Sequence, residues 1–203
     1  MKAVILNCTL KASPEPSSTE ALAKVAIAEL EKLGAETELV RLVDLNIKPG
    51  VTGDEGEGDD WPAVDAKLKA ADIVIFATPI WLGQMSSVAQ RALERMDAWF
   101  EETDDSGRPV AFGKVAGIVI TGNEDGAHNI VATISQGLID MGFTMPAQSW
   151  TYWHLGSGPG PDYADTDEGH DYSDRVARSA ARNIVALAKV LTPDTYPVPE
   201  SGE

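Results

Sequence analysis

The chain has 203 residues, of which 43% are apolar and 24% charged, as expected for one globular domain large enough to bury a core. Its 32 acidic and 16 basic side chains give a formal charge of −16. This balance argues against nucleic acid or an anionic membrane as a partner, because both attract positive surfaces. No stretch approaches the ~20 apolar residues of a membrane span. The single cysteine, Cys8, excludes an internal disulfide, indicates a cytoplasmic protein and is expected to be buried.

The first 33 residues predict a buried strand, a hydroxyl-rich loop and an amphipathic helix. Residues 2–8 are apolar, residues 9–19 hold several hydroxyls, and residues 20–33 have helical periodicity that stops at Gly34. Such a loop is a natural anion site, because helical N–H groups without acceptors point into it, and Lys11 adds a positive charge. Ser17 and Glu20 also match a capping box, which forms without any ligand. Phosphate binding and simple helix capping are therefore both open. The glycine spacings of P-loops and dinucleotide-binding loops are absent.

The rest of the chain alternates strand and helix patterns. Further strands are predicted at residues 36–42, 72–78, 116–121 and 143–150, and helices at 61–70, 86–100, 128–141 and 173–191. Asp60 is the expected N-cap of the second helix, and Pro79 is expected to end the third strand. Residues 46–60 are expected to form an exposed, mobile loop, and residues 152–172 a long loop. The alternation predicts a doubly wound parallel sheet in one domain, residues 1–191, followed by a poorly ordered tail, residues 192–203.

Ligands of such sheets bind beyond the carboxyl ends of the strands, so the loops after the first, third and fourth strands should meet at one rim. In the second of these loops, Trp81 offers a flat aromatic face and Gly83 allows close approach to the backbone. A core tryptophan beside an ordinary turn is the alternative. The third loop, residues 121–126, has two glycines and polar groups suited to the edge of a heterocycle.

Together the three loops resemble those of the flavodoxin-like NADPH-dependent FMN reductase and quinone reductase family, over residues 2–142. The resemblance implies a flavodoxin-like three-layer sandwich with a five-stranded parallel sheet of order 2-1-3-4-5. It assigns the FMN phosphate to the first loop, the ring and ribityl chain to the second, and the pyrimidine edge to the third. The residues that match these roles are Thr9, Lys11, Ser17, Ser18 and Thr19; Pro79, Ile80, Trp81, Leu82 and Gly83; and Thr121, Gly122, Asn123, Asp125 and Gly126. Extra residues around Pro14 and Pro16 leave Ser13, Ser17 and Ser18 as alternatives for the phosphate contact.

The resemblance further implies an FMN-dependent oxidoreductase that passes electrons from NADPH or NADH to a quinone, free flavin or similar small acceptor. No catalytic side chain and no metal is expected, and His128 and His154 are expected to be surface residues rather than proton donors. The family also implies a homodimer or homotetramer. Residues 152–160 are expected either to wall the pocket or to form a buried plug. Two alternatives stay open: a flavodoxin-type electron carrier, which suits the acidic surface, and a binding module that has lost its flavin.

Overall fold

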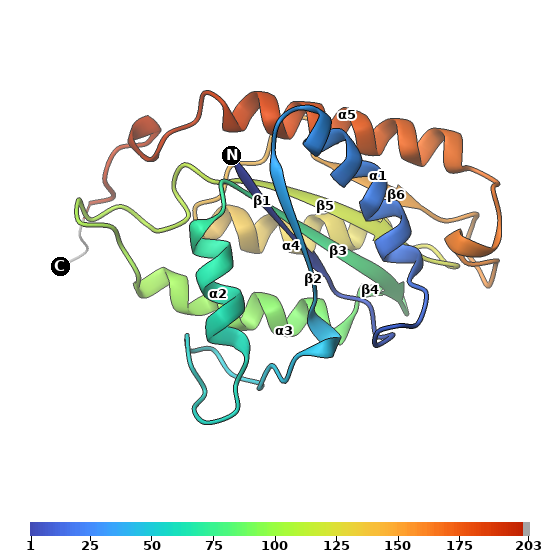
Figure 1. Ribbon diagram of the computed structural model, residues 1–203, viewed down its shortest axis with the longest axis horizontal. Helices are drawn as coiled ribbons and strands as arrows, with labels where there is room; N and C mark the ends of the chain where they lie inside the picture. The colour runs from blue at the N-terminus through green and yellow to red at the C-terminus, as the bar shows by residue number, and fades with distance from the viewer. Residues whose placement is uncertain (201–203) are drawn as a thin grey trace.

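A parallel sheet forms the centre of the computed structural model, which describes residues 1–200 (Figure 1). Its main strands are β1 (Lys2–Asn7), β2 (Glu36–Arg41), β3 (Ile73–Trp81), β5 (Val115–Thr121) and β6 (Trp150–Trp153). They are ordered β2-β1-β3-β5-β6, and the two-residue strand β4 (Gln84–Met85) pairs antiparallel with the end of β3. With β4 set aside, this is the predicted order 2-1-3-4-5, and the flavodoxin-like fold is confirmed.

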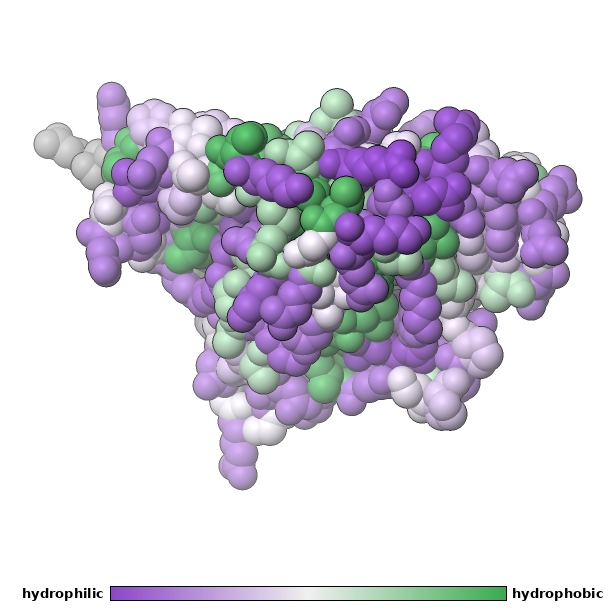
Figure 2. Space-filling model, turned by 45° about the horizontal axis from the view of Figure 1, so that its top comes forward, coloured by the Kyte–Doolittle hydropathy of each residue, from purple (hydrophilic) through white to green (hydrophobic). Residues whose placement is uncertain are grey.

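Helices cover both faces of the sheet. The helices α1 (Ser18–Lys32) and α5 (His170–Ala188) lie on one face, and α2 (Trp61–Ala70), α3 (Ser87–Met96) and α4 (Ala127–Asp140) lie on the other (Figure 1). The outer surface on the α1 and α5 side is mainly hydrophilic (Figure 2). Among residues 1–200, no helix combines the length and the apolar character needed to cross a membrane.

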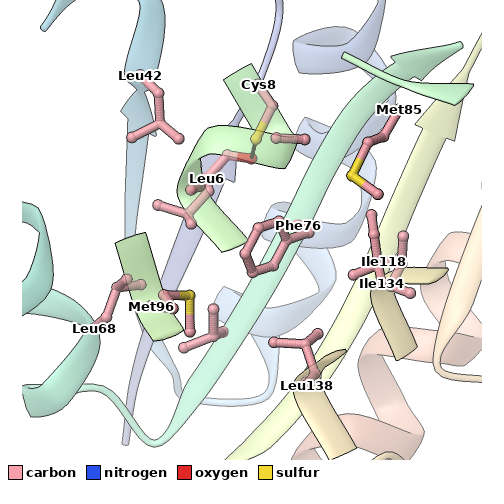
Figure 3. Close-up of a cluster of buried hydrophobic side chains, with 14 of the residues drawn as sticks. Leu6, Cys8, Leu42, Leu68, Phe76, Met85, Met96, Ile118, Ile134 and Leu138 are labelled. Atoms are coloured by element: carbon pink, nitrogen blue, oxygen red, sulfur yellow. Dashed lines mark hydrogen bonds between the residues drawn. The ribbon is translucent and has the colours of Figure 1, made fainter. Parts of the chain in front are cut away.

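Each face of the sheet carries its own hydrophobic core. On the side of α2, α3 and α4, Leu6, Phe76 and Ile118 from three strands point into one cluster (Figure 3). Cys8 belongs to this cluster with 0% of its surface exposed, as predicted, and burial raises the pKa of its thiol. Because only the thiolate is a good nucleophile, Cys8 is a packing residue rather than a reactive one.

Two strand predictions are wrong in detail. Pro79 does not end β3, which continues to Trp81 and pairs Pro79 with Thr121 of β5. The proline is tolerated because β1 pairs with β3 only as far as Ala77, so no neighbour on that side needs its missing N–H. The last strand was predicted at residues 143–150, but β6 starts only at Trp150. Within residues 143–149, only Thr144 forms a β-bridge to β5.

The loop at residues 46–60 is tied to α3 by a buried arginine. Arg95 is 0% exposed, forms an ion pair with Asp59 at 2.8 Å, and donates hydrogen bonds to the carbonyls of Lys48 and Thr52, each at 3.0 Å. Burial opposes ionisation of Asp59, but backbone N–H groups and Arg95 outweigh it and lower the pKa of this carboxyl to about 2. The loop is therefore bound to the domain at its base rather than loosely attached.

The start of α2 differs from the prediction at its cap. Asp60 has helical backbone angles and makes no side-chain cap bond; its carboxylate accepts a hydrogen bond from the N–H of Asn46 instead. The N–H of Trp61 is satisfied by Asp59 at 3.2 Å, one residue earlier than expected.

The predicted tail begins with residues that contact the domain. The 3-10 helix η4 (Pro193–Thr195) places Asp194 3.2 Å from Arg108, and the ring of Tyr196 lies 5.4 Å from that of Phe112. Residues 201–203, the end of that tail, lie outside the described residues.

Candidate functional site

The loops after β1, β3 and β5 meet at the carboxyl ends of the strands, on the right of Figure 1, and line one pocket. Ten of the predicted site residues share its lining. They are Thr9, Lys11, Ser18, Thr19, Pro79, Ile80, Trp81, Thr121, Gly122 and Asn123. Three lining residues were not predicted: Leu10, Asp162 and Tyr163. Five predicted residues lie outside the lining: Ser17, Leu82, Gly83, Asp125 and Gly126.

One end of the pocket is built to receive an anion. The first turn of α1 begins at Ser18, and the N–H groups of Ser18 and Thr19 have no acceptor within the helix. Hydroxyls of Ser18, Thr19 and Thr9 line the same space, and Lys11 brings a positive charge. The hydroxyl oxygens of Thr19 and Thr121 lie 2.9 Å apart, so the helix start is joined directly to the end of β5. Donors from two loops therefore converge at one place, as anion binding requires.

The structure separates the three serines that the sequence left as alternatives. Ser13 points away from the pocket, since its backbone N–H and hydroxyl both donate to Asp44, at 2.8 and 2.6 Å. Ser17 is the N-cap of α1 and accepts the N–H of Glu20 at 3.1 Å. Only Ser18 of the three lines the pocket.

The extra loop residues are held by Arg41, which donates to the carbonyls of Lys11 and Glu15 and pairs with Glu20. Burial alone would raise the pKa of Glu20, but hydrogen bonds from Lys24 and Arg41 lower it. The carboxylate nearest the start of α1 is thus ionised and fully paired.

The second wall is a hairpin that presents an aromatic face. Trp81 is 51% exposed beside the pocket, and the two-residue turn that follows has φ values of +52° at Leu82 and +72° at Gly83, the pattern of a type I′ turn. A Cβ at Gly83 would meet no protein atom within 4 Å, so what the fold itself requires of this glycine is the positive φ of the turn. A Cβ at Gly126 would lie 2.6 Å from Gly83, so the second and third loops touch where both lack side chains.

Neither His128 nor His154 belongs to the lining of this pocket. His128 and His154 flank the ring of Tyr152, at centroid distances of 5.2 and 5.5 Å. Trp153 is only 2% exposed and its indole N–H donates to the carbonyl of Glu168, so the buried-plug alternative holds for this residue.

Asp162 and Tyr163 add a third wall to the pocket, just beyond residues 152–160, which the sequence offered as a possible wall. The 3-10 helix η3 (Tyr163–Asp165) places Asp162 and Tyr163 in the pocket lining, and Asp162 lies 3.8 Å from the ammonium of Lys11. The N–H of Ala164 donates to the hydroxyl of Ser18 at 3.2 Å. These partners are 146 residues apart, and no spacing or periodicity in the sequence connects them.

The pocket fits a flavin mononucleotide at all but one position. An anion end with free N–H groups lies opposite an exposed tryptophan face, matching a phosphate and a flat aromatic ring. Asp162 is the exception, because a carboxylate repels a phosphate. Among the described residues, no cluster of three or more His, Cys, Asp or Glu side chains is placed to hold a metal.

The fold and the pocket define a flavodoxin-like protein with a nucleotide-type anion site at its switch point. A sequence profile of the NADPH-dependent FMN reductase family matches residues 1–156, and the chain belongs to that family. It is therefore an enzyme of flavin-dependent oxidoreduction, with FMN as its cofactor and NAD(P)H as its electron donor.

Two relatives and one crystal structure are similar to this chain. The 8-demethyl-8-aminoriboflavin-5′-phosphate synthase of Streptomyces davaonensis is 35% identical, over 97% of this chain and 80% of that protein. The crystal structure of RosB with bound 8-demethyl-8-formylriboflavin-5′-phosphate is 34% identical with a TM-score of 0.86, over 93% of this chain and 79% of that one. The divalent metal cation transporter MntH of Mycobacterium bovis is 33% identical over 94% of this chain, but the match covers 29% of that protein.

Proposed function

We propose that the pocket binds FMN and that the enzyme passes electrons from NADPH or NADH to a quinone, a free flavin or a similar small acceptor. The observation that carries the proposal is one pocket holding both the start of α1 with Lys11 and the exposed face of Trp81. Bound FMN would accept a hydride from the nicotinamide and release electrons to the acceptor. The protein's part is to bind the phosphate, orient the ring and leave one ring face open.

In this arrangement the first loop and α1 hold the phosphate through Thr9, Lys11, Ser18 and Thr19. The segment from Pro79 to Trp81 supports the ring, and Thr121 to Asn123 contact its polar edge. Leu82, Gly83 and Gly126 act indirectly, by fixing the hairpin against the third loop. Leu82 donates its N–H to the carboxylate of Glu124 at 2.6 Å, which ties the hairpin to that loop.

An anaerobic absorbance spectrum of the protein with added FMN, followed by NADPH or NADH, tests this proposal. Bound flavin that bleaches within seconds supports an NAD(P)H-dependent reductase, and subsequent addition of quinones or free flavins identifies the acceptor. Bound flavin that stays oxidised until dithionite is added indicates an electron carrier instead. A protein that takes up no FMN contradicts the proposal.

A second candidate function is chemical modification of a riboflavin 5′-phosphate. The similarity to the synthase of Streptomyces davaonensis, over 97% of this chain, favours it. Mass spectrometry of the flavin recovered after turnover separates the two, because a reductase returns FMN with its mass unchanged.

Three expectations stay predictions: a single FMN-binding domain at residues 1–191, a homodimer or homotetramer, and a cytoplasmic location. Limited proteolysis tests the first. Size-exclusion chromatography with light scattering tests the second.

A further inference from the structure

Asp162 stands in the anion end of the pocket, where a carboxylate opposes the expected ligand. Its Oδ2 lies 3.8 Å from the ammonium of Lys11, and the two side chains are 40% and 48% exposed. Lys11 and Asp162 are the only charged side chains in the lining formed by the described residues. The charged groups that line the pocket therefore sum to zero before any ligand enters.

Asp162 is held in place by its neighbour. Tyr163 is 5% exposed and donates its hydroxyl to Asp174 at 2.8 Å, while its ring stacks on His170 with a centroid distance of 3.7 Å. Trp153 packs edge-on against the same ring. Burial, together with the bond to Asp174, raises the pKa of Tyr163, so it stays a neutral donor. The backbone beside Asp162 is thus anchored, and the carboxylate cannot simply move off with a mobile loop.

The same segment also prepares a donor for the phosphate. Because the hydroxyl of Ser18 accepts the N–H of Ala164, its own hydrogen is left to donate into the pocket. Residues 162–164 therefore act in two opposite ways: they orient one phosphate donor and they set a negative charge against the phosphate.

We propose that Asp162 is a specificity-determining residue that reduces the preference of the pocket for phosphorylated over unphosphorylated flavin. It does so by occupying the ammonium of Lys11 and by repelling the phosphate directly. Asp162 does not change the energy with which the ring binds at Trp81. The difference in affinity between FMN and riboflavin is therefore smaller than the hydroxyl and N–H groups alone would produce. This inference rests on the proposed flavin site.

The test compares FMN and riboflavin affinities in three proteins by quenching of flavin fluorescence at low salt. Asp162→Asn removes the charge and keeps the shape. Asp165→Asn is the matched control, since Asp165 belongs to the 3-10 helix that follows Asp162 directly, has the same charge and lies outside the pocket lining. We expect Asp162→Asn to tighten FMN roughly tenfold, riboflavin to change less than about twofold, and the gain to shrink at about 0.5 M salt. We expect Asp165→Asn to change neither ligand by more than about twofold.

An unchanged ratio of FMN to riboflavin affinity in Asp162→Asn overturns the inference. A loss of FMN affinity overturns it as well, because the carboxylate would then serve to position Lys11. In both cases wild-type flavin binding leaves the proposed function standing. Absence of any flavin binding to the wild-type protein contradicts the proposed function itself, and circular dichroism confirms that the variants are folded.

Discussion

Replacing Trp81 by alanine should weaken the binding of FMN and riboflavin equally. Trp81 is 51% exposed in the free protein, and that exposed half is the surface a flavin ring can cover. A tryptophan side chain offers about 250 Å² at most, so roughly 125 Å² is available here. At about 25 cal/mol per Å² this gives a ceiling of about 3 kcal/mol, and about 1.5 kcal/mol if the ring covers only one face.

These energies correspond to a loss of affinity of about 10- to 150-fold for each flavin. The assay is a fluorescence titration of FMN and riboflavin against wild type and Trp81→Ala. Leu82→Ala is the control in the same hairpin, because Leu82 is 90% exposed and lies outside the pocket lining. Its effect should stay below about threefold, since it removes no surface that faces the ring.

Two results would refute this reasoning. Trp81→Ala that binds both flavins as wild type does would show that the ring lies elsewhere. A loss for FMN without one for riboflavin would place Trp81 at the phosphate rather than at the ring. Unchanged circular dichroism is needed in each case, because Trp81 also pairs with Gln84 in the hairpin.

Four further predictions concern single residues. Lys11→Ala should weaken FMN by about 1.5–3 kcal/mol, the scale of a hydrogen bond to a charged group, and leave riboflavin unchanged in the same titration. Arg95→Met should lower the free energy of unfolding in urea by about 3–5 kcal/mol, because it leaves the carboxylate of Asp59 buried and unpaired. Because folding lowers the pKa of Asp59 to about 2, its contribution to stability is full above about pH 4 and is lost as the pH falls through 2. In Asp59→Asn this contribution is absent, so the urea midpoint of unfolding should change less with pH between about 4 and 2 than it does in the wild type. Gly83→Ala should cost about 1–2 kcal/mol of stability through its φ of +72°, whereas Gly53→Ala, with open space and no positive φ, should cost little in the same urea assay.

The sequence predicts most of the sheet, because the central strands β1, β3 and β5 are mainly apolar runs. The predicted limits of α2, residues 61–70, match the structure fully, since Pro62 and the following periodicity mark its start. The last strand was misplaced because residues 143–150 also contain spaced apolar residues, among them Phe143, Met145 and Trp150. The positive φ of Gln148, which changes the chain direction before β6, cannot be read from that pattern. The prediction that Pro79 ends β3 was wrong for a related reason. The energetic cost of a proline in a strand depends on whether a neighbouring strand needs its N–H, and here that depends on where β1 ends, which the local sequence does not show.

The pocket likewise contains residues that the sequence predicts and residues that it does not. Thr9 and Lys11 come shortly after β1 and Trp81 ends β3, so strand positions were enough to bring them together. The segment with Asp162 and Tyr163 comes from a loop whose path is set by stacking on His170 and by the bond between Ala164 and Ser18. The bond between Ala164 and Ser18 joins the loop before α5 to the start of α1, 146 residues away, so no local pattern contains it.

The charge of the protein limits how this pocket attracts a phosphate. With a net charge of −16, the surface repels anions at long range, and the positive charges near the anion end are already paired. Arg41 and Lys24 are paired with Glu20, and Lys11 with Asp162. Affinity for a phosphate must therefore come from short-range hydrogen bonds aimed at one point, given by N–H and hydroxyl groups and by the ammonium of Lys11, which are little screened by salt. Wild-type FMN binding should accordingly depend only weakly on ionic strength. An FMN affinity that falls steeply with salt would mean that unpaired positive charge at the pocket, and not the orientation of donors at the start of α1, holds the phosphate.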